Sequence, residues 1–394
     1  MNSSKVNMQR YFHLDLPVGQ SAFLWGARKT GKSTYLKNRY PTAVYYDLLK
    51  SDVLIRLSKE PYLFREEVLA LSDEQLMQPI IVDEVQKIPS LLDEIHWLIE
   101  NTQAYFILCG SSARKLKRGA ANLLGGRAWR FTFYPFIYKE IPDFDLLHAL
   151  NSGLIPSHYL SAHYQRSLNA YVEDYLTQEI QAEGLARSLP VFARFLDAVA
   201  FGHGALINYS NIARDCGIDT KTVKSYYDIL VDTLLGYMIP PYHKHVKRDL
   251  IKEAGKFYLF DVGLANHLQK QVVAELKGIP AGNSFEHFIL MELIAYKGLC
   301  ERDFSISFWR TKTGLEVDFI LGDASVAIEV KISQQISKSD IKGLLAFMED
   351  YSTEKGYVVC NSEQARKWLL DNGKEIWFLP YAEFLQHLWA GKII

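Results

Sequence analysis

The segment 26–33, Gly-Ala-Arg-Lys-Thr-Gly-Lys-Ser, constrains the fold of this chain more than any other feature. It fits the phosphate-binding pattern G-x-x-x-x-G-K-[ST] at every fixed position. It lies between an apolar run at 22–25, typical of a strand, and residues 34–37, typical of a helix start. A loop at such a turn presents backbone N–H groups and the positive end of a helix to phosphate oxygens. The sequence therefore predicts a nucleoside triphosphate site.

The positions of this loop have different expected roles. Lys32 should reach the β- and γ-phosphates, and the hydroxyl of Ser33 should bind Mg²⁺. ATP and Mg²⁺ are therefore the expected cofactors. The other residues expected to contact the nucleotide are Gly26, Ala27, Arg28, Lys29, Thr30, Gly31 and Thr34.

A second apolar run, 79–82, ends in Asp83 and Glu84, which is the pattern of a buried parallel strand with carboxylates at its C-terminal end. Ligands of open α/β sheets bind beyond these strand ends. We expect Asp83 to meet the Mg²⁺ bound by Ser33, and Glu84 to orient or polarise the attacking water. The pair predicts hydrolysis of the nucleotide as well as binding.

A third buried strand is expected at 105–109, and it is followed by Gly110, Ser111 and Ser112. A hydroxyl at this strand end can hydrogen-bond the γ-phosphate or the attacking water, which makes Ser111 a candidate catalytic residue. A Gly-Ser-Ser turn is also ordinary loop chemistry, so both interpretations stay open.

The segment 113–130 carries basic residues and no acidic one. Three interpretations are open for it: binding of nucleic-acid phosphate, an arginine finger for a neighbouring subunit, and a solvated basic face. Arg127 is the candidate for the finger. The other basic residues of the segment are Arg114, Lys115, Lys117, Arg118 and Arg130.

Charge and composition exclude several classes of protein. The net charge is −1, so nucleic acid could be bound only by a local site. The four cysteines stand apart without zinc-ligand spacing, which favours reduced thiols in the cytoplasm. No run approaches the ~18 apolar residues of a membrane span, so we expect a cytoplasmic protein without a membrane partner.

The chain of 394 residues is too long for one hydrophobic core, and its pattern suggests three parts. Alternating strands and helices predict a parallel α/β domain at 1–150. Helical patterns at 159–183 and 189–201 introduce a helical and winged helix-turn-helix region at 151–250. The rest, 251–394, is predicted to be a further α/β domain.

Residues 209–227 read as a helix-turn-helix. Ser210 is expected to cap the first helix, Gly217 to permit the turn, and Asp219 or Thr220 to cap the second helix. Outward-facing Lys221 and Lys224 could enter a major groove of DNA, and the alternative is packing between subunits.

The last third contains a group of acids and one lysine. Strands at 316–321 and 326–331 are expected to form a β-hairpin, and a helix is expected to open at Ser284. Strand alternation puts Glu316, Asp318 and Ile320 on one face of the first strand, and Glu329 and Lys331 on one face of the second. With Glu286 on the helix, the carboxylates of Glu286, Asp318 and Glu329 are candidate ligands of a divalent ion, and Lys331 could stabilise developing charge. The alternative is a polar sheet face with an ion pair.

These motifs resemble the prokaryotic AAA-type ATPases that join an N-terminal P-loop domain to a C-terminal domain of uncharacterised function. The segments that carry the resemblance are the loop 26–33, the strand ending in Asp83-Glu84, Gly110-Ser111-Ser112, Gly126-Arg127 before Pro135, and Tyr175-Leu176. The resemblance gives Ser111 the position called sensor 1. The hairpin with Asp318 and Glu329-x-Lys331 is similar to the PD-(D/E)XK nuclease core, although Asp318 lacks the preceding proline.

The expected protein is a Mg²⁺-dependent ATPase that couples its cycle to a winged helix and a nuclease-like domain, with DNA and further copies of the chain as candidate partners. The rival interpretation is a nucleotide-dependent signalling or assembly switch. Its C-terminal domain would be catalytically inactive and would bind partners.

Overall fold

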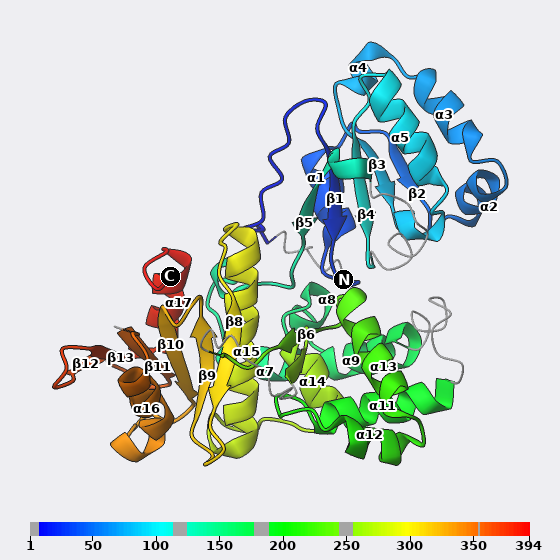
Figure 1. Ribbon diagram of the computed structural model, residues 1–394. Coiled ribbons are helices and arrows are strands. Elements are labelled where there is room, and N and C mark those ends of the chain that lie inside the picture. The colour runs from blue at the N-terminus through cyan, green and yellow to red at the C-terminus, as the bar shows by residue number, and fades with distance from the viewer. Residues whose placement is uncertain (1–7, 113–123, 177–188, 244–254, 354) are drawn as a thin grey trace. The chain divides into compact units, whose positions relative to one another are not determined.

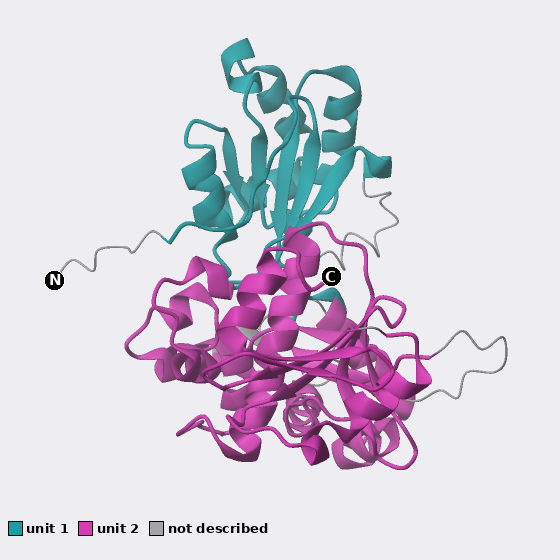
Figure 2. Cartoon of the chain, turned by 90° about the vertical axis from the view of Figure 1, so that its left-hand side faces the viewer, with its two compact units in different colours: residues 1–135, 232–235 teal, residues 136–231, 236–394 magenta. Residues whose placement is uncertain are grey.

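The computed structural model describes residues 8–112, 124–176, 189–243, 255–353 and 355–394 (Figure 1). The chain divides into two compact units (Figure 2). Unit 1 comprises residues 1–135 and 232–235, and unit 2 comprises residues 136–231 and 236–394. The finer division at residues 150 and 250 stays a prediction.

Unit 1 is built on a five-stranded parallel sheet in the order β2-β3-β4-β1-β5. Its strands are β1 (Ser21–Trp25), β2 (Tyr45–Asp47), β3 (Ile80–Asp83), β4 (Phe106–Gly110) and β5 (Ala128–Thr132). The residues of β1, β3 and β4 are all buried, as expected for central strands covered on both faces. The predicted α/β domain is therefore confirmed.

Helices cover this sheet. They are α1 (Lys32–Arg39), α2 (Ser51–Lys59), α3 (Tyr62–Leu69), α4 (Asp73–Leu76) and α5 (Leu91–Asn101), with short 3₁₀ helices at Val85–Lys87 and Leu124–Gly126. The apolar residues of α5 recur at helical spacing, and Leu91, Ile95 and Leu98 join Phe106 and Leu108 of β4 in one hydrophobic core. This core fixes the C-terminal ends of β3 and β4, where the predicted site residues lie.

The first part of unit 2 is helical. Its helices are α7 (Leu146–Ser152), α8 (Pro156–Tyr159), α9 (Tyr164–Ala170), a π-helix (Tyr171–Leu176), α11 (Leu189–Phe201), α12 (Tyr209–Cys216), α13 (Thr220–Asp232) and α14 (Val262–Leu268), with a 3₁₀ helix at Tyr138–Glu140. The single helix predicted over 159–183 is wrong at its start, because α8 ends at Tyr159 and α9 begins at Tyr164. Its last residues, 177–183, lie outside the described part of the chain.

Helices α12 and α13 form the predicted helix-turn-helix. Gly217 adopts φ 67°, a left-handed conformation that glycine tolerates best, and it ends α12. The cap at Ser210 is wrong: the side chain of Asn208 accepts the hydrogen bond from the N–H of Asn211. Asp219 caps α13 by accepting a hydrogen bond from the N–H of Thr222 at 2.8 Å.

Two strands follow, β6 (Gly236–Ile239) and β7 (Lys256–Leu259), and they pair antiparallel as a two-stranded sheet. The segment 244–254 between them lies outside the described residues, and with it part of the basic segment expected to form a wing. The winged helix therefore stays a prediction.

The second part of unit 2 is a six-stranded mixed sheet in the order β12-β13-β11-β10-β9-β8. Its strands are β8 (Ile306–Arg310), β9 (Glu316–Leu321), β10 (Val326–Lys331), β11 (Lys355–Cys360), β12 (Arg366–Leu369) and β13 (Glu375–Pro380), and its helices are α15 (Gly278–Leu299), α16 (Lys342–Asp350) and α17 (Tyr381–Trp389), with a 3₁₀ helix at Lys338–Ile341. The predicted hairpin is present as antiparallel β9 and β10.

The helix expected to open at Ser284 begins earlier, at Gly278. Pro280 lies in its first turn, where a helix has no need of a backbone N–H donor, so the proline starts the helix instead of ending it. Ser284 is an internal residue whose hydroxyl donates to the carbonyl of Pro280 at 2.8 Å.

Candidate functional site

The phosphate-binding loop connects β1 to α1, and two glycines give it its shape. Gly31 precedes α1 with φ 102°, a conformation that side chains other than glycine rarely adopt. Gly26 approaches β5 so closely that a Cβ atom there would lie 2.4 Å from the carbonyl oxygen of Phe133. Thr30 closes the turn, because its hydroxyl donates to the carbonyl of Ala27 at 2.8 Å.

Lys32 is buried inside this loop. Its Nζ atom donates to the carbonyls of Gly26 at 2.6 Å and Ala27 at 3.0 Å, so the ammonium group lies within the turn where phosphate is expected. Arg10, which sequence reasoning missed, donates to the carbonyl of Thr30 at 2.8 Å. Its partner is a backbone carbonyl far along the chain, so no local pattern could have pointed to it.

The remaining loop residues form one continuous turn with the first residues of α1. Ala27 is buried, Arg28 is half-buried, and Lys29 and Thr34 are exposed. The backbone of Lys29 has φ 61°, in the left-handed region. This turn and the helix start behind it have the form expected of a phosphate loop.

Ser33 and Asp83 come from different elements and meet at the C-terminal edge of the sheet. The hydroxyl of Ser33 donates to Oδ2 of Asp83 at 2.6 Å, and the hydroxyl of Tyr45 donates to the same oxygen at 2.5 Å. Burial, followed by the charge of Asp83, raises the pKa of Tyr45 well above its ordinary value, so Tyr45 stays a donor. Two adjacent hard oxygen ligands fit Mg²⁺, which binds few protein oxygens and completes its shell with phosphates and water.

Glu84 follows Asp83 with φ 59°, an unusual conformation for a residue other than glycine. Its Oε2 atom lies 2.5 Å from Nε2 of Gln86 and 3.4 Å from Oγ of Ser111. Nε2 of Gln86 also donates to Oγ of Ser111 at 3.1 Å. The end of β3 and the end of β4 are thus joined by a small buried hydrogen-bond network, in which sequence reasoning missed Gln86.

Arg127 lies at the N-terminal end of the parallel strands, opposite the end where the loop and Asp83 lie. It precedes β5, whose first residue Ala128 pairs with Ser21, the first residue of β1. The phosphate loop follows the last residue of β1, about 16 Å away for five residues of strand. Arg127 forms an ion pair with Glu100, and both side chains are partly exposed. Arg114, Lys115, Lys117 and Arg118 lie outside the described residues.

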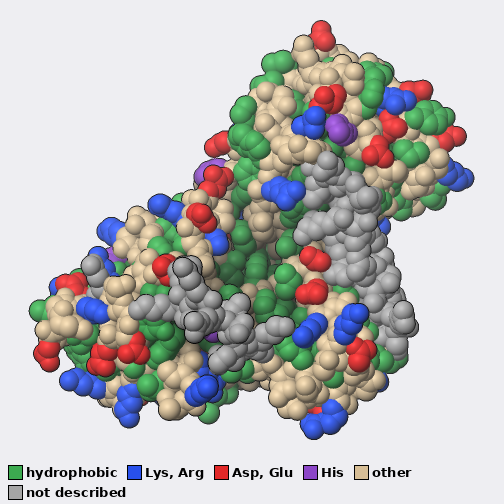
Figure 3. Space-filling model, viewed as in Figure 1, with side chains coloured by type: hydrophobic (Ala, Val, Ile, Leu, Met, Phe, Trp, Pro, Cys, Tyr) green, Lys and Arg blue, Asp and Glu red, His purple; other side chains and the backbone are tan. Residues whose placement is uncertain are grey.

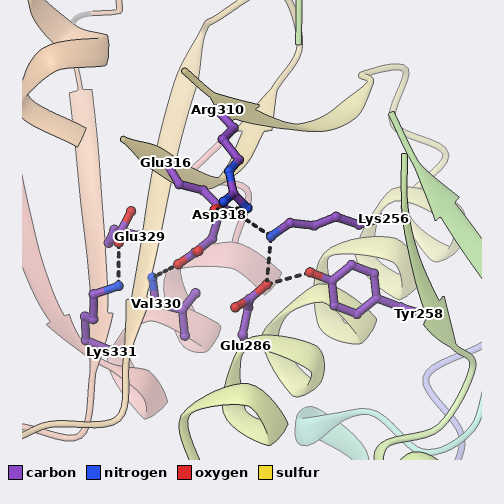
Figure 4. Close-up of polar contacts among 9 residues, drawn as sticks. All are labelled: Lys256, Tyr258, Glu286, Arg310, Glu316, Asp318, Glu329, Val330 and Lys331. Carbon is purple, nitrogen blue, oxygen red and sulfur yellow. Dashed lines mark hydrogen bonds and ion pairs between the residues drawn. The ribbon is translucent and has the colours of Figure 1, made fainter. Parts of the chain in front are cut away.

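The acids of the last third come from β9, β10 and α15 of unit 2 (Figure 4). Nζ of Lys331 lies 2.5 Å from Oε1 of Glu329, and the backbone N–H of Val330 donates to Oδ2 of Asp318 at 2.7 Å. Glu286 of α15 accepts a hydrogen bond from the hydroxyl of Tyr258 at 2.5 Å.

Lys256 of β7 is the most important residue that sequence reasoning missed here. Its Nζ atom lies 2.5 Å from Oε1 of Glu316 and 3.7 Å from Oε1 of Glu286 (Figure 4). Its side chain is 5% exposed, whereas those of Glu316 and Glu286 are 27% and 21% exposed, so a buried ammonium group meets two half-buried carboxylates. The signal was present in the sequence, because the apolar run 257–260 predicts a buried strand and Lys256 stands directly before it.

Burial and mutual repulsion set the protonation of these acids. Burial, together with the charge of Asp318, raises the pKa of Glu286 to about 7. Burial also raises the pKa of Asp318, although Lys331 and Lys256 act against this. Burial, followed by the charge of Asp318, raises the pKa of Glu329 well above its ordinary value. The predicted acids thus share one electrostatic environment.

A β-bulge determines where Asp318 points. Ser307 pairs with Ile320 and Trp309 pairs with Val317, so Phe308 alone stands opposite two residues, Asp318 and Phe319. The alternation used in the sequence prediction is interrupted there. Ile320 packs in the hydrophobic cluster with α16, whereas Asp318 lies near Lys256 and Glu286. The prediction that Asp318 and Ile320 share a face is therefore wrong.

The residues present do not fit a divalent metal ion in this arrangement. Among the described residues, no group of three or more His, Cys, Asp or Glu side chains is placed to hold a metal ion. Lys256 lies between the carboxylates of Glu286 and Glu316, and Asp318 already accepts a backbone N–H. One observation is in favour of a metal ion: Oε2 of Glu329 is buried without a hydrogen-bond partner in the described part of the chain.

Three family profiles match the chain. An AAA domain matches residues 19–142, and two domains of unknown function match residues 144–275 (DUF8612) and 281–384 (DUF4143). The match to the AAA domain and the parallel sheet agree with the AAA-type P-loop ATPase expected from the sequence. The nuclease-like assignment of the last third gains no support from these matches.

Two curated relatives, uncharacterised proteins of Mycobacterium tuberculosis and Mycobacterium bovis, are each 26% identical over 262 residues. The match covers 64% of this chain and 57% of each relative, so it spans little more than half of their length.

Two solved structures align with parts of this chain. The Walker-type ATPase PABY2304 of Pyrococcus abyssi has a TM-score of 0.41 and 17% identity, over 63% of this chain and 90% of that one. The ORC1 protein of Aeropyrum pernix in complex with DNA has a TM-score of 0.26 and 13% identity, over 65% and 87%. Within the described residues, no helix has the length and apolar character needed to cross a membrane.

Proposed function

We propose that this chain is a Mg²⁺-dependent ATPase. The observation that carries the proposal is the meeting of Ser33, Asp83 and Glu84 at one edge of the parallel sheet, next to the loop that holds Lys32. These residues come from a strand-to-helix turn and from a second strand, and β4 lies between the two strands in the sheet. Such an arrangement supplies the groups that bind, neutralise and hydrolyse a nucleoside triphosphate.

In this proposal each residue acts at a stated atom. The ammonium of Lys32 leaves its two loop carbonyls and binds phosphate oxygens. The oxygens of Ser33 and Asp83 would hold Mg²⁺, which when bound neutralises the charge of the phosphates. The carboxylate of Glu84 orients the attacking water, and Ser111 holds that carboxylate by a hydrogen bond.

Arg127 would act on a neighbouring copy of the chain. It lies too far from its own loop to reach the nucleotide there, so an arginine finger would have to be supplied between subunits. A finger also requires Arg127 to leave Glu100, and both side chains are exposed enough for this rearrangement. The proposal therefore includes a homo-oligomer.

The hydrolysis cycle would drive unit 2, and two outputs are open. Exposed Lys221 and Lys224 of α13 support a contact with DNA. On the face shown in Figure 3, acidic and basic side chains are interspersed over the described residues, which favours a local contact over a broad basic surface. The position of Lys256 among the acids supports the rival output, an inactive C-terminal domain that binds partners.

The test is hydrolysis of ATP by the purified chain with Mg²⁺, measured as phosphate release, together with binding of a fluorescent ATP analogue. Lys32→Ala should lose both, because it removes the cation at the phosphates. Lys50→Ala, at an exposed lysine of the same unit, is the matched control and should behave as wild type. If wild-type protein neither binds nor hydrolyses any nucleoside triphosphate, the proposal is wrong.

A further inference from the structure

The buried lysine of β7 stands where the sequence predicted a metal ion. Lys256 is flanked by Oε1 of Glu316 at 2.5 Å and Oε1 of Glu286 at 3.7 Å, and its Nζ atom lies 5.2 Å from the centre of the Phe308 ring. Figure 4 shows its side chain reaching from β7 toward the carboxylates of α15 and β9. Two carboxylates and the face of an aromatic ring therefore lie beside this ammonium group, and each of them attracts a cation.

Buried carboxylates need a counter-charge, because removing them from water is costly unless they are paired. Arg310 contributes to this, since its NH1 atom lies 3.3 Å from Oε2 of Glu316. Lys331 is already paired with Glu329. For Glu286, the cation that the structure supplies is Lys256.

A divalent ion and this ammonium group would compete for the same oxygens. Mg²⁺ needs near-octahedral oxygen ligands at about 2.1 Å, and a lysine inserted between two of the carboxylates prevents that approach. A lysine is a compact point charge with three donors, so it can bridge two acids and still leave one oxygen of each for other donors. Arg310 uses this opportunity at Oε2 of Glu316. At Glu286, Tyr258 donates to the same Oε1 atom that faces Lys256.

We propose that Lys256 is the built-in cation of this acidic cluster, so that unit 2 holds Glu286, Glu316 and Asp318 together without a divalent metal ion. Removing the charge at position 256 then creates a divalent cation site from these three carboxylates. The inference concerns unit 2 alone, and its outcome is independent of whether unit 1 hydrolyses ATP.

The experiment measures binding of Mn²⁺ to the full chain without nucleotide, by the loss of the free Mn²⁺ signal in electron paramagnetic resonance. All proteins carry Asp83→Ala, so that the predicted nucleotide site contributes no ligand from β3. The first comparison is between this protein and the same protein with Lys256→Met, which keeps an unbranched side chain one atom shorter and removes its charge. Lys331→Met is the matched control.

With Lys256 present, we expect no saturable Mn²⁺ binding. Lys256→Met should bind one Mn²⁺ at least about tenfold more tightly than its parent does. A tenfold change in affinity corresponds to the free energy by which a nearby charge shifts a pKa by one unit. It should also melt at a lower temperature than its parent and recover when Mn²⁺ is added. Lys331→Met should gain less, because the ion pair of Lys331 is with Glu329, whereas Lys256 lies beside Glu286 and Glu316.

Two results would overturn the inference. One is saturable Mn²⁺ binding with Lys256 present that disappears on Asp318→Asn or Glu329→Gln. The other is a folded Lys256→Met protein that binds no Mn²⁺. If Lys256→Met does not fold, the measurement on the protein with Lys256 still decides between a built-in cation and a metal site, and Lys256→Gln provides the second variant.

Discussion

Nε2 of Gln86 lies 2.5 Å from Oε2 of Glu84 and 3.1 Å from Oγ of Ser111. A single buried amide therefore connects the residue proposed to orient water with the strand end that carries Ser111. In the bound complex such a donor would fix the rotamer of Glu84. Gln86 is thus a positioning residue for the proposed hydrolysis.

Gln86→Leu should lower kcat by roughly 10- to 100-fold, the usual effect of losing an orienting partner. KM should change less, because Gln86 contacts Glu84 and Ser111 instead of the loop that holds Lys32. Steady-state hydrolysis at varied ATP concentration measures both. Gln103→Leu, at an exposed glutamine of unit 1, is the control. An unchanged kcat would leave Gln86 with a packing role.

Glu84→Gln should bind ATP and fail to turn it over. The amide cannot accept a proton or orient water as a carboxylate does, and loss of one such contact costs about 10²–10³ in rate. Binding and single-turnover hydrolysis, measured on the same sample, separate the two steps. Turnover at the wild-type rate would remove Glu84 from the proposed mechanism.

Arg127→Ala should abolish hydrolysis and spare nucleotide binding, because a finger supplied between subunits contributes about 10³–10⁵ in turnover. Mixing Arg127→Ala with Lys32→Ala protein should restore part of the activity, since some interfaces then combine an intact loop with an intact Arg127. Glu100→Gln, which frees Arg127 from its ion pair, should retain hydrolysis. Full hydrolysis by Arg127→Ala alone would make the residue a surface cation.

Unit 2 should become less stable as pH falls, through two buried histidines. The N–H of Leu259 donates to Nδ1 of His203, His203 hydrogen-bonds His287 at 3.0 Å, and Nε2 of His287 hydrogen-bonds the carbonyl of Leu259 at 2.6 Å. This closed ring is complete when both histidines are neutral. Burial lowers the pKa of His203 well below its ordinary value and that of His287 to about 4.

Because the folded pKa values are lowered, the unfolded chain binds more protons below pH 6.5, and stability is lost as pH falls toward 4. His203→Gln keeps one donor and one acceptor without a titrating ring, so its loss of stability between pH 7.5 and 5 should be smaller than that of wild type. Urea midpoints at the two pH values measure this. The raised pKa of Glu286 changes stability in the opposite direction, because it lets the folded state bind more protons as pH falls. This contribution is common to wild type and His203→Gln, so the difference between the two proteins does not contain it. An equal loss in both proteins would contradict the prediction.

The residues of the proposed nucleotide site could be predicted from sequence because their arrangement is local. Gly26 to Ser33 form one turn, and Asp83 and Glu84 end one strand, so a fixed spacing determines their geometry. Tyr45 and Gln86 could not be found in this way. Tyr45 reaches Asp83 after β2 has paired with β3, and Gln86 reaches Ser111 after β3 has paired with β4. Neither residue belongs to a spacing pattern.

The acidic cluster shows the limit of strand alternation. The hairpin was predicted correctly, and the neighbourhood of Asp318 and Glu329 is real. The side to which Asp318 turns depends on the pairing of β9 with β8, where one residue faces two. Lys256 comes from a separate two-stranded sheet, so its meeting with Glu316 is a tertiary contact that no periodicity within β9 could indicate.

The bulge in β9, a strand of six residues, determines which of its side chains face the apolar layer under α16 and which face the charged residues. Val317 and Ile320 both face the apolar layer under α16, although an uninterrupted strand would turn one of them away. The two residues between them are released from that layer, and Asp318 turns to the charged side. Removing one of these two residues would abolish the bulge and leave the residues on both sides of it facing as they do now. The extra residue of the bulge therefore lets one strand of unit 2 turn two consecutive side chains, those of Asp318 and Phe319, away from α16.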